Sequence, residues 1–189
     1  MDKIKFQENL IDQIKEAQLK LGFAKETIRL YYPAASLCRL LNLECKSGEE
    51  LVEELENGNE FKETPLGEIK FSLCGGERIE VQIPAEGAVY VNENIPDPPF
   101  LVRIIDLFGH RHHSSEEELT IEDICECFKS FNDNYVCEKM ETETDFDYVL
   151  YFPDEQPDAW YYCIKFEMNH VIYHRFTKED YISIVKCEI

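Results

Sequence analysis

The string His110-Arg111-His112-His113 places three imidazoles within four residues. Imidazole nitrogens are common zinc ligands, so a zinc site built on His110, His112 and His113 is one hypothesis. A structural zinc site needs further ligands, and none stands at a standard spacing. Cys125 and Cys127 do not supply them, because residues two apart on a predicted helix point about 200° away from each other. We therefore expect a polar loop here, and no metal or other cofactor.

A second histidine pair, His170 and His174, has the four-residue spacing that brings two metal ligands together on a helix. The surrounding residues alternate as in a strand, where four residues span about 13 Å, too far for both imidazoles to bind one ion. His174 also falls on the predicted strand next to the one that carries Cys163. A cysteine beside a histidine can act as a nucleophile with its base. No local signature supports catalysis, so Cys163 and His174 are candidates only and the catalytic residues stay unknown.

Other catalytic motifs are missing from the sequence. It contains no phosphate-binding loop of the Gly-x-Gly-x-x-Gly or Walker type, and Gly75-Gly76 is a turn between two predicted strands. Carboxylate pairs of the glycosidase type cannot be recognised, because 39 acidic residues produce many pairs by chance. The sequence therefore favours a non-catalytic protein, with a small enzyme as the alternative.

Aromatic residues crowd the last part of the chain, where residues 135–181 hold 12 of the 23. Trp160 and Tyr162 share one parity of a predicted strand and Tyr161 has the other, so both faces of a sheet carry rings. One face must pack on helices. We expect the other to be covered as well, because large exposed apolar patches are rare in monomers. If it forms a pocket instead, the binding candidates are Trp160, Tyr162, His170 and Arg175.

The negative charge is concentrated in three segments. Of the net charge of −20, residues 44–63 carry −6, residues 116–126 carry −6 and residues 141–158 carry −7. Such segments are either solvated faces that keep an acidic protein soluble or a docking face for a basic partner. No segment has the spaced carboxylates and central glycine of a calcium-binding EF-hand loop.

The overall charge and hydropathy exclude several classes of protein. A net charge of −20 disfavours binding to nucleic-acid phosphates and to anionic membrane surfaces. No apolar run approaches the roughly 20 residues of a membrane-spanning helix, and the first ten residues lack the apolar stretch of a signal peptide. We therefore expect a cytoplasmic protein in which the eight cysteines are reduced and mostly buried.

In the first half of the chain, the apolar spacing predicts helices and one hairpin. Pro33 and a Ser47–Glu50 capping box each begin a helix. The expected elements are a helix over 5–21 that ends at Gly22, a short helix over 24–30, helices after Pro33 and Ser47, and a β-hairpin over 69–83, with 85–95 unassigned.

In the second half, two helices precede four strands. We expect Gly109 to close the first helix, Thr120 to cap the second, and Phe146, Tyr148, Leu150 and Phe152 to share one face of the sheet. The expected elements are helices over 100–108 and from 120, strands over 135–140, 145–152, 160–166 and 171–176, and a short helix over 177–184.

Four strings, Asn9 to Asp12, Ile28 to Pro33, Tyr148 to Pro153 and His170 to Thr177, resemble an uncharacterised protein family of gut Clostridia that is catalogued as a domain of unknown function. The resemblance covers most of the chain. It implies a bacterial cytosolic protein, and it implies no activity, cofactor or catalytic residue.

Strands and helices that occur in blocks predict an α+β fold. It has N-terminal helices with a β-hairpin (1–95), then helices packed on an antiparallel aromatic-rich β-meander with a short C-terminal helix (96–189). We expect the two regions to form one unit. The predicted function is an acidic interaction or regulatory protein, such as an immunity protein, inhibitor or adaptor, that binds a basic protein partner. The alternative is a small-molecule-binding protein or small enzyme with a pocket on the aromatic sheet. The oligomeric state stays unknown.

Overall fold

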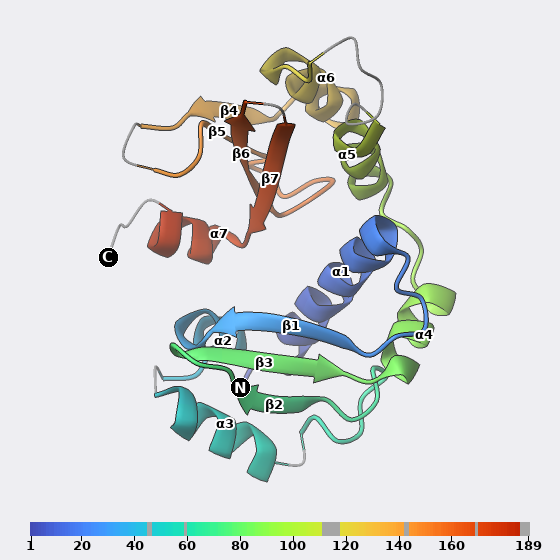
Figure 1. The fold of residues 1–189 in the computed structure, drawn as a ribbon, viewed down its shortest axis with the longest axis vertical. Helices are drawn as coiled ribbons and strands as arrows, with labels where there is room; N and C mark the ends of the chain where they lie inside the picture. Colours follow the sequence, from blue (N-terminus) through green and yellow to red (C-terminus); the bar gives the residue numbers. More distant parts are fainter. Residues whose placement is uncertain (45–46, 59, 111–117, 142–143, 169, 186–189) are drawn as a thin grey trace. The chain divides into compact units, whose positions relative to one another are not determined.

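The chain divides between Asp97 and Pro98 into two units, Met1–Asp97 and Pro98–Ile189 (Figure 1). The computed structural model describes residues 1–44, 47–58, 60–110, 118–141, 144–168 and 170–185. Its helices and its two antiparallel sheets confirm the predicted α+β class. None of the described helices has the length and apolar character needed to cross a membrane.

The first unit begins with the long amphipathic helix α1 (Lys3–Leu21). The Asp2 carboxylate accepts a hydrogen bond from the Lys5 amide at 3.1 Å and caps the free donors of the first turn. Gly22 has φ 72° and ends the helix, as predicted, because glycine adopts this left-handed conformation without strain. Phe6, Leu10 and Ile14 are fully buried and form the core face of the helix, whereas Leu21 at its last turn is 63% exposed.

A three-stranded antiparallel sheet in the order β1-β3-β2 forms the centre of the first unit (Figure 1). The predicted hairpin is confirmed as β2 (Lys70–Leu73) and β3 (Arg78–Ile83). The predicted helix over 24–30 is wrong, because Ile28–Pro33 is strand β1, in which Ile28 pairs with Ile83. Pairing with β3, which is distant in sequence, decides the conformation of this segment.

Three further helices complete the first unit. α2 (Ala34–Leu41) begins after Pro33 and α3 (Gly48–Asn57) begins after the Ser47 cap, both as predicted. The unassigned segment is the helix α4 (Ala85–Asn94). The core joins these helices to the sheet around the rings of Phe6, Phe61 and Phe71. The Phe6 and Phe61 ring centroids lie 5.5 Å apart in an edge-to-face contact.

The second unit opens with α5 (Pro99–His110) and α6 (Ile121–Phe131). Thr120 and Asp123 form a reciprocal capping box, which confirms Thr120 as the cap of α6. The prediction that Gly109 closes α5 is wrong, because the helix continues through Gly109 to His110.

Gly109→Ala is expected to raise the free energy of unfolding by about 0.5–1 kcal/mol, because glycine inside a helix costs that much relative to alanine. A Cβ at Gly109 meets no described atom within 4 Å. The control is Gly22→Ala, which is equally uncrowded but has φ 72° and should destabilise the protein. Urea denaturation compares the two variants, and a lower stability for Gly109→Ala would contradict the prediction.

Four antiparallel strands in the order β4-β5-β6-β7 form the predicted meander. A short helix, α7 (Lys178–Asp180), follows and continues as a π-helical turn, η1 (Tyr181–Val185). The strands are β4 (Val136–Lys139), β5 (Tyr148–Tyr151), β6 (Tyr161–Glu167) and β7 (His170–Phe176).

Both faces of this sheet carry packed rings. Trp160 and Tyr162 pack in one cluster with residues of α5 and α6. Tyr161 belongs to the opposite face, where Tyr181 and Val185 of η1 are buried against Val149 and Cys163. Phe146 lies on this second face, so its predicted common face with Tyr148, Leu150 and Phe152 is wrong. It precedes the first residue of β5, and the two-residue period of a strand does not extend to it.

Candidate functional site

Three of the four predicted binding residues, Trp160, Tyr162 and Arg175, lie together. Tyr162 pairs with Arg175 in the β6–β7 register, and the Arg175 guanidinium carbon lies 4.5 Å from the Trp160 ring centroid. This distance is typical of a cation–π contact. His170 lies at the other end of β7, where its Nε2 is 2.7 Å from Oε2 of Glu167. The structure therefore does not bring His170 to the other three residues.

Asp158 organises this group of side chains. Its carboxylate accepts one hydrogen bond from the Trp160 amide at 2.7 Å and another from the Tyr162 hydroxyl at 2.9 Å. We call Asp158, Trp160, Tyr162 and Arg175 the Asp158 cluster. Sequence reasoning missed Asp158, although its two- and four-residue spacing to Trp160 and Tyr162 places all three on one side of an extended chain.

Burial determines the chemistry of the Asp158 cluster. It raises the pKa of the Tyr162 phenol well above the usual value, and the negative charge of Asp158 raises it further, against the opposing effect of Arg175. Tyr162 is therefore a fixed, neutral hydrogen-bond donor at physiological pH. Its hydroxyl donates a hydrogen bond to Asp158 within the cluster. The contacts of the cluster hold the start of β6 to the end of β7. A small-molecule site here stays a prediction.

The candidate catalytic residues Cys163 and His174 are direct partners in the β6–β7 register. Cys163 is fully buried, and burial raises the pKa of its thiol to about 12. A thiol with this pKa is almost entirely neutral at pH 7, and the thiolate is the reactive form. His174 is exposed, and its ring lies 5.6 Å from that of Phe146 between centroids. The pair is close in the sheet, and nothing in its environment activates the thiol.

The predicted histidine loop lies largely outside the described residues. This is so for His112 and His113 and for the side chain of His110, the last residue of α5. Within the described part of the chain, no group of three or more His, Cys, Asp or Glu side chains could hold a metal ion. The zinc hypothesis stays untested.

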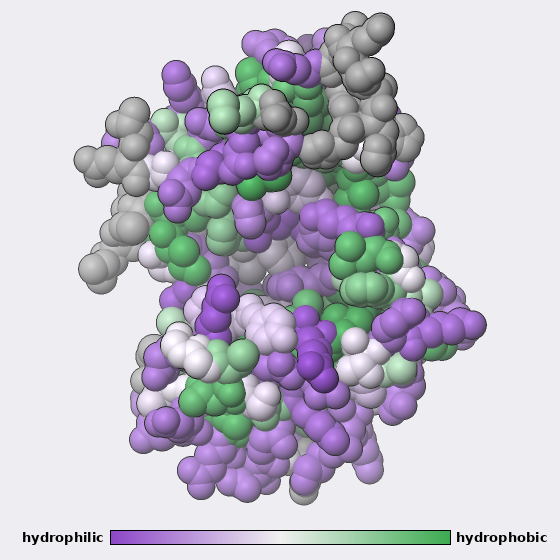
Figure 2. Space-filling model, viewed as in Figure 1, coloured by the Kyte–Doolittle hydropathy of each residue, from purple (hydrophilic) through white to green (hydrophobic). Residues whose placement is uncertain are grey.

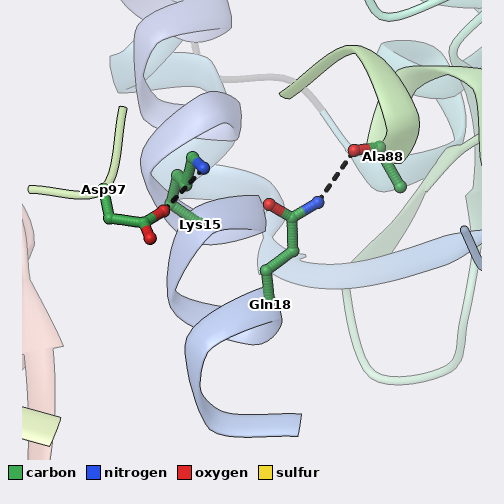
Figure 3. Close-up of polar contacts among 4 residues, drawn as sticks. All are labelled: Lys15, Gln18, Ala88 and Asp97. Atoms are coloured by element: carbon green, nitrogen blue, oxygen red, sulfur yellow. Dashed lines mark hydrogen bonds and ion pairs between the residues drawn. The ribbon is translucent and has the colours of Figure 1, made fainter. Parts of the chain in front are cut away.

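A buried lysine is a second feature that sequence reasoning missed. Lys15 of α1 has only 3% of its side chain exposed, and its Nζ lies 2.8 Å from Oδ1 of Asp97 (Figure 3). One turn further along, Gln18 donates a hydrogen bond to the Ala88 carbonyl of α4 at 2.8 Å. The available signal was the position of Lys15 four residues after Ile11, at the edge of the apolar face of α1. These contacts attach α4 and the end of the first unit to α1.

The outer surface of α3 is the most acidic helix surface that the structure describes in the first unit. Glu49, Glu50, Glu53 and Glu56 are exposed, and the helix contains no lysine or arginine. On the inner side Leu51 and Leu55 are buried in the core. Figure 2 shows hydrophilic side chains along the lower edge of the first unit, where α3 lies in Figure 1.

The cysteines are less uniformly buried than the sequence suggested. All six that the structure describes are free thiols. Cys38, Cys127 and Cys163 are buried, whereas Cys125 is half-buried and Cys74 and Cys137 are exposed.

These features define a two-unit α+β protein with an acidic helix surface in the first unit and an aromatic-rich meander in the second. The chain belongs to the family described as "Domain of unknown function, E. rectale Gene description (DUF3877)", whose model matches residues 3–185. This confirms the resemblance to an uncharacterised clostridial family. No curated protein and no solved structure shows significant similarity to the chain.

Proposed function

We propose that this protein is a non-catalytic interaction module that binds a basic protein partner through the outer surface of α3. The observation that carries the proposal is the pattern of charge on this helix. Glu49 and Glu53 are four residues apart, Glu50 and Glu53 are three apart, and no basic side chain within the helix separates them. The proposal is independent of the Asp158 cluster.

The acidic pattern is locally unfavourable. Like charges three or four residues apart on a helix cost about 0.2–0.5 kcal/mol per pair. Glu56 also lies in the last turn, where the helix dipole disfavours negative charge, whereas Glu49 and Glu50 lie in the first turn, where the dipole favours it. Lysines or arginines of a partner would relieve both effects. A local rule that a sequence breaks without compensation is a typical sign of a functional surface.

Folding of α3 does not depend on the carboxylates of Glu49, Glu50 and Glu53, whereas the Glu56 carboxylate accepts a hydrogen bond from the Phe71 amide of β2. The Ser47 hydroxyl accepts a hydrogen bond from the Glu50 amide at 3.3 Å, and Leu51 and Leu55 attach the helix to the core. Glu49, Glu50 and Glu53 can therefore be neutralised while the helix stays folded. Variants that neutralise these glutamates therefore change binding without changing the stability of the helix.

Glu49→Gln/Glu50→Gln/Glu53→Gln is expected to weaken partner binding at low salt by about tenfold or more, because each lost contact between opposite charges contributes roughly 0.2–1 kcal/mol. The matched control is Glu68→Gln/Glu86→Gln/Glu93→Gln, which removes the same charge from exposed positions elsewhere in the first unit. The measurement is quantitative capture from a lysate of the source organism by the wild type and both variants, at low and moderate salt.

A supporting partner is basic, is retained by the wild type and the control variant, and is lost from the α3 variant and at higher salt. The salt dependence follows because exposed charges are screened beyond roughly 8–10 Å near physiological ionic strength. Equal capture by all three proteins, or partners that do not respond to salt, would refute the proposal.

A further inference from the structure

The two faces of the three-stranded sheet in the first unit differ in character. On one face, Ile79, Val81 and Ile83 of β3 are fully buried in the core that the sheet shares with the helices. The alternate residues of the three strands form the opposite face, which we call the outer face. Its members are Arg29, Tyr31 and Pro33 of β1, Arg78, Glu80 and Gln82 of β3, and Lys70 and Ser72 of β2.

The outer face is open in the first unit. β1 lies in front of α1 in Figure 1, so the outer face is turned toward the viewer. Figure 2, from the same side, shows hydrophilic side chains over the area of β1. Arg29, Lys70 and Arg78 are all exposed, so their cationic groups can be reached from solvent.

The charge of the outer face is opposite to that of the whole protein. Three of its four charged residues are basic, whereas the chain has 39 acidic and 19 basic residues. Its one acid, Glu80, has Oε1 3.8 Å from Nε of Arg29, and the side chain of this arginine is 58% exposed. An exposed ion pair of this length is weak. The Arg29 guanidinium therefore stays able to contact a further anionic group.

The strand register sets the spacing of these cations. Gln82 pairs with Arg29 on one side and with Lys70 on the other, so the three residues form a row across the sheet. Strands lie roughly 4.8 Å apart, which places the backbones of Arg29 and Lys70 about 10 Å from each other. Arg78 is four residues from Gln82 along β3, or about 13 Å. Carboxylates three or four residues apart in an extended chain have the same spacing.

Tyr31 adds an apolar contact surface among these charges. It pairs with Glu80 in the register and is 48% exposed, although it is a large aromatic residue. Tyrosine and arginine are the residue types that contribute most of the binding energy at protein interfaces, together with tryptophan. The outer face thus combines exposed cations with an aromatic ring, as protein-binding surfaces do.

We propose that the outer face of this sheet docks an acidic polypeptide segment, which crosses the strands in an extended conformation and places carboxylates on Arg29, Lys70 and Arg78. Charge complementarity carries the choice of partner. The net charge of −20 repels a long polyanion such as a nucleic acid, whereas a short acidic segment meets mainly the local positive charge. This surface is separate from the acidic surface of α3 and takes a partner of opposite charge.

The test measures binding of a labelled peptide to the full chain by fluorescence anisotropy. The probe is a peptide of about twelve residues built of Glu-Ser-Ser repeats, which repeats a carboxylate about every 10 Å in an extended chain. The matched probe has glutamine in place of each glutamate. We expect the glutamate peptide to bind at low salt about tenfold or more tightly than the glutamine peptide, and to be released as salt rises.

Arg29→Gln/Lys70→Gln/Arg78→Gln is expected to weaken binding of the glutamate peptide by about tenfold or more. The matched control is Lys5→Gln/Lys25→Gln/Lys62→Gln, which removes the same charge from exposed positions outside the sheet. The control should keep most of the affinity. The α3 variant described above should bind the peptide at least as well as the wild type, so this test and the test of the α3 surface succeed or fail separately.

Equal binding of the two peptides by the wild type would overturn the proposal, and this comparison needs no variant to fold. An equal loss of affinity in the two triple variants would also overturn it, because the effect would then belong to the total charge and not to the outer face. A single-stranded oligouridylate that binds more tightly than the glutamate peptide would assign the outer face to phosphates instead of carboxylates.

Discussion

Phe100→Ala is expected to lower the free energy of unfolding of the second unit by about 3–5 kcal/mol, the usual cost of removing a buried phenylalanine ring. Phe100 is 2% exposed, and its ring centroid lies 4.9 Å from that of Phe128, 5.1 Å from that of Phe152 and 5.6 Å from that of Tyr162. The ring thus joins α5 to α6 and to the sheet. Its removal leaves a cavity that packed neighbours on several elements cannot fill by moving together.

Urea denaturation followed by tryptophan fluorescence measures this effect, because the only tryptophan, Trp160, is buried in the same cluster. The control is Phe131→Ala. Phe131 also contacts Phe100, at 5.2 Å between centroids, but it is 38% exposed, so we expect a loss nearer 1 kcal/mol. Equal losses for the two variants would show that Phe100 does not have the central role that its contacts indicate.

Asp97→Ala is expected to destabilise the first unit by about 2–3 kcal/mol, because it leaves the Lys15 ammonium buried without its carboxylate. Breaking a buried pair costs roughly 3–5 kcal/mol, and we expect less here because the Asp97 side chain is 56% exposed. Lys15→Met should be far milder, since it removes the buried charge and keeps the apolar stem of the side chain. The double variant should recover most of the loss of Asp97→Ala.

Hydrogen exchange of the α1 amides measures the local stability that this pair provides. Glu93→Ala removes an exposed acid of the same unit and should change the stability by no more than about 0.5 kcal/mol. A loss for Asp97→Ala no larger than that of the control would mean that water solvates Lys15 adequately without Asp97. A loss for Lys15→Met as large as that for Asp97→Ala would show that the ion pair itself stabilises the first unit, rather than only compensating for the buried charge of Lys15.

Contacts close in sequence explain the successful predictions. The hairpin around Gly75 and Gly76, the end of α1 at Gly22 and the caps at Ser47 and Thr120 depend on residues within a few positions of one another. Their turn and capping chemistry can be read directly from the chain. The aromatic alternation around Trp160 and Tyr162 likewise predicted the meander and the presence of rings on both of its faces.

Contacts distant in sequence explain what the sequence left undecided or predicted wrongly. The segment Ile28–Pro33 is a strand because β3, which is distant in sequence, pairs with it. The face that Phe146 occupies follows from where β5 begins.

Composition, spacing and caps determined by themselves that this is an acidic α+β protein with an aromatic meander, because those signals act over a few residues. Only the tertiary structure decided that Lys15 forms an ion pair with Asp97 and that the Tyr162 hydroxyl donates a hydrogen bond to Asp158. The physical reason is that each of these contacts depends on how an element packs or on the path of a loop. The free energy of packing is distributed over the whole core, and no local pattern of residues encodes it.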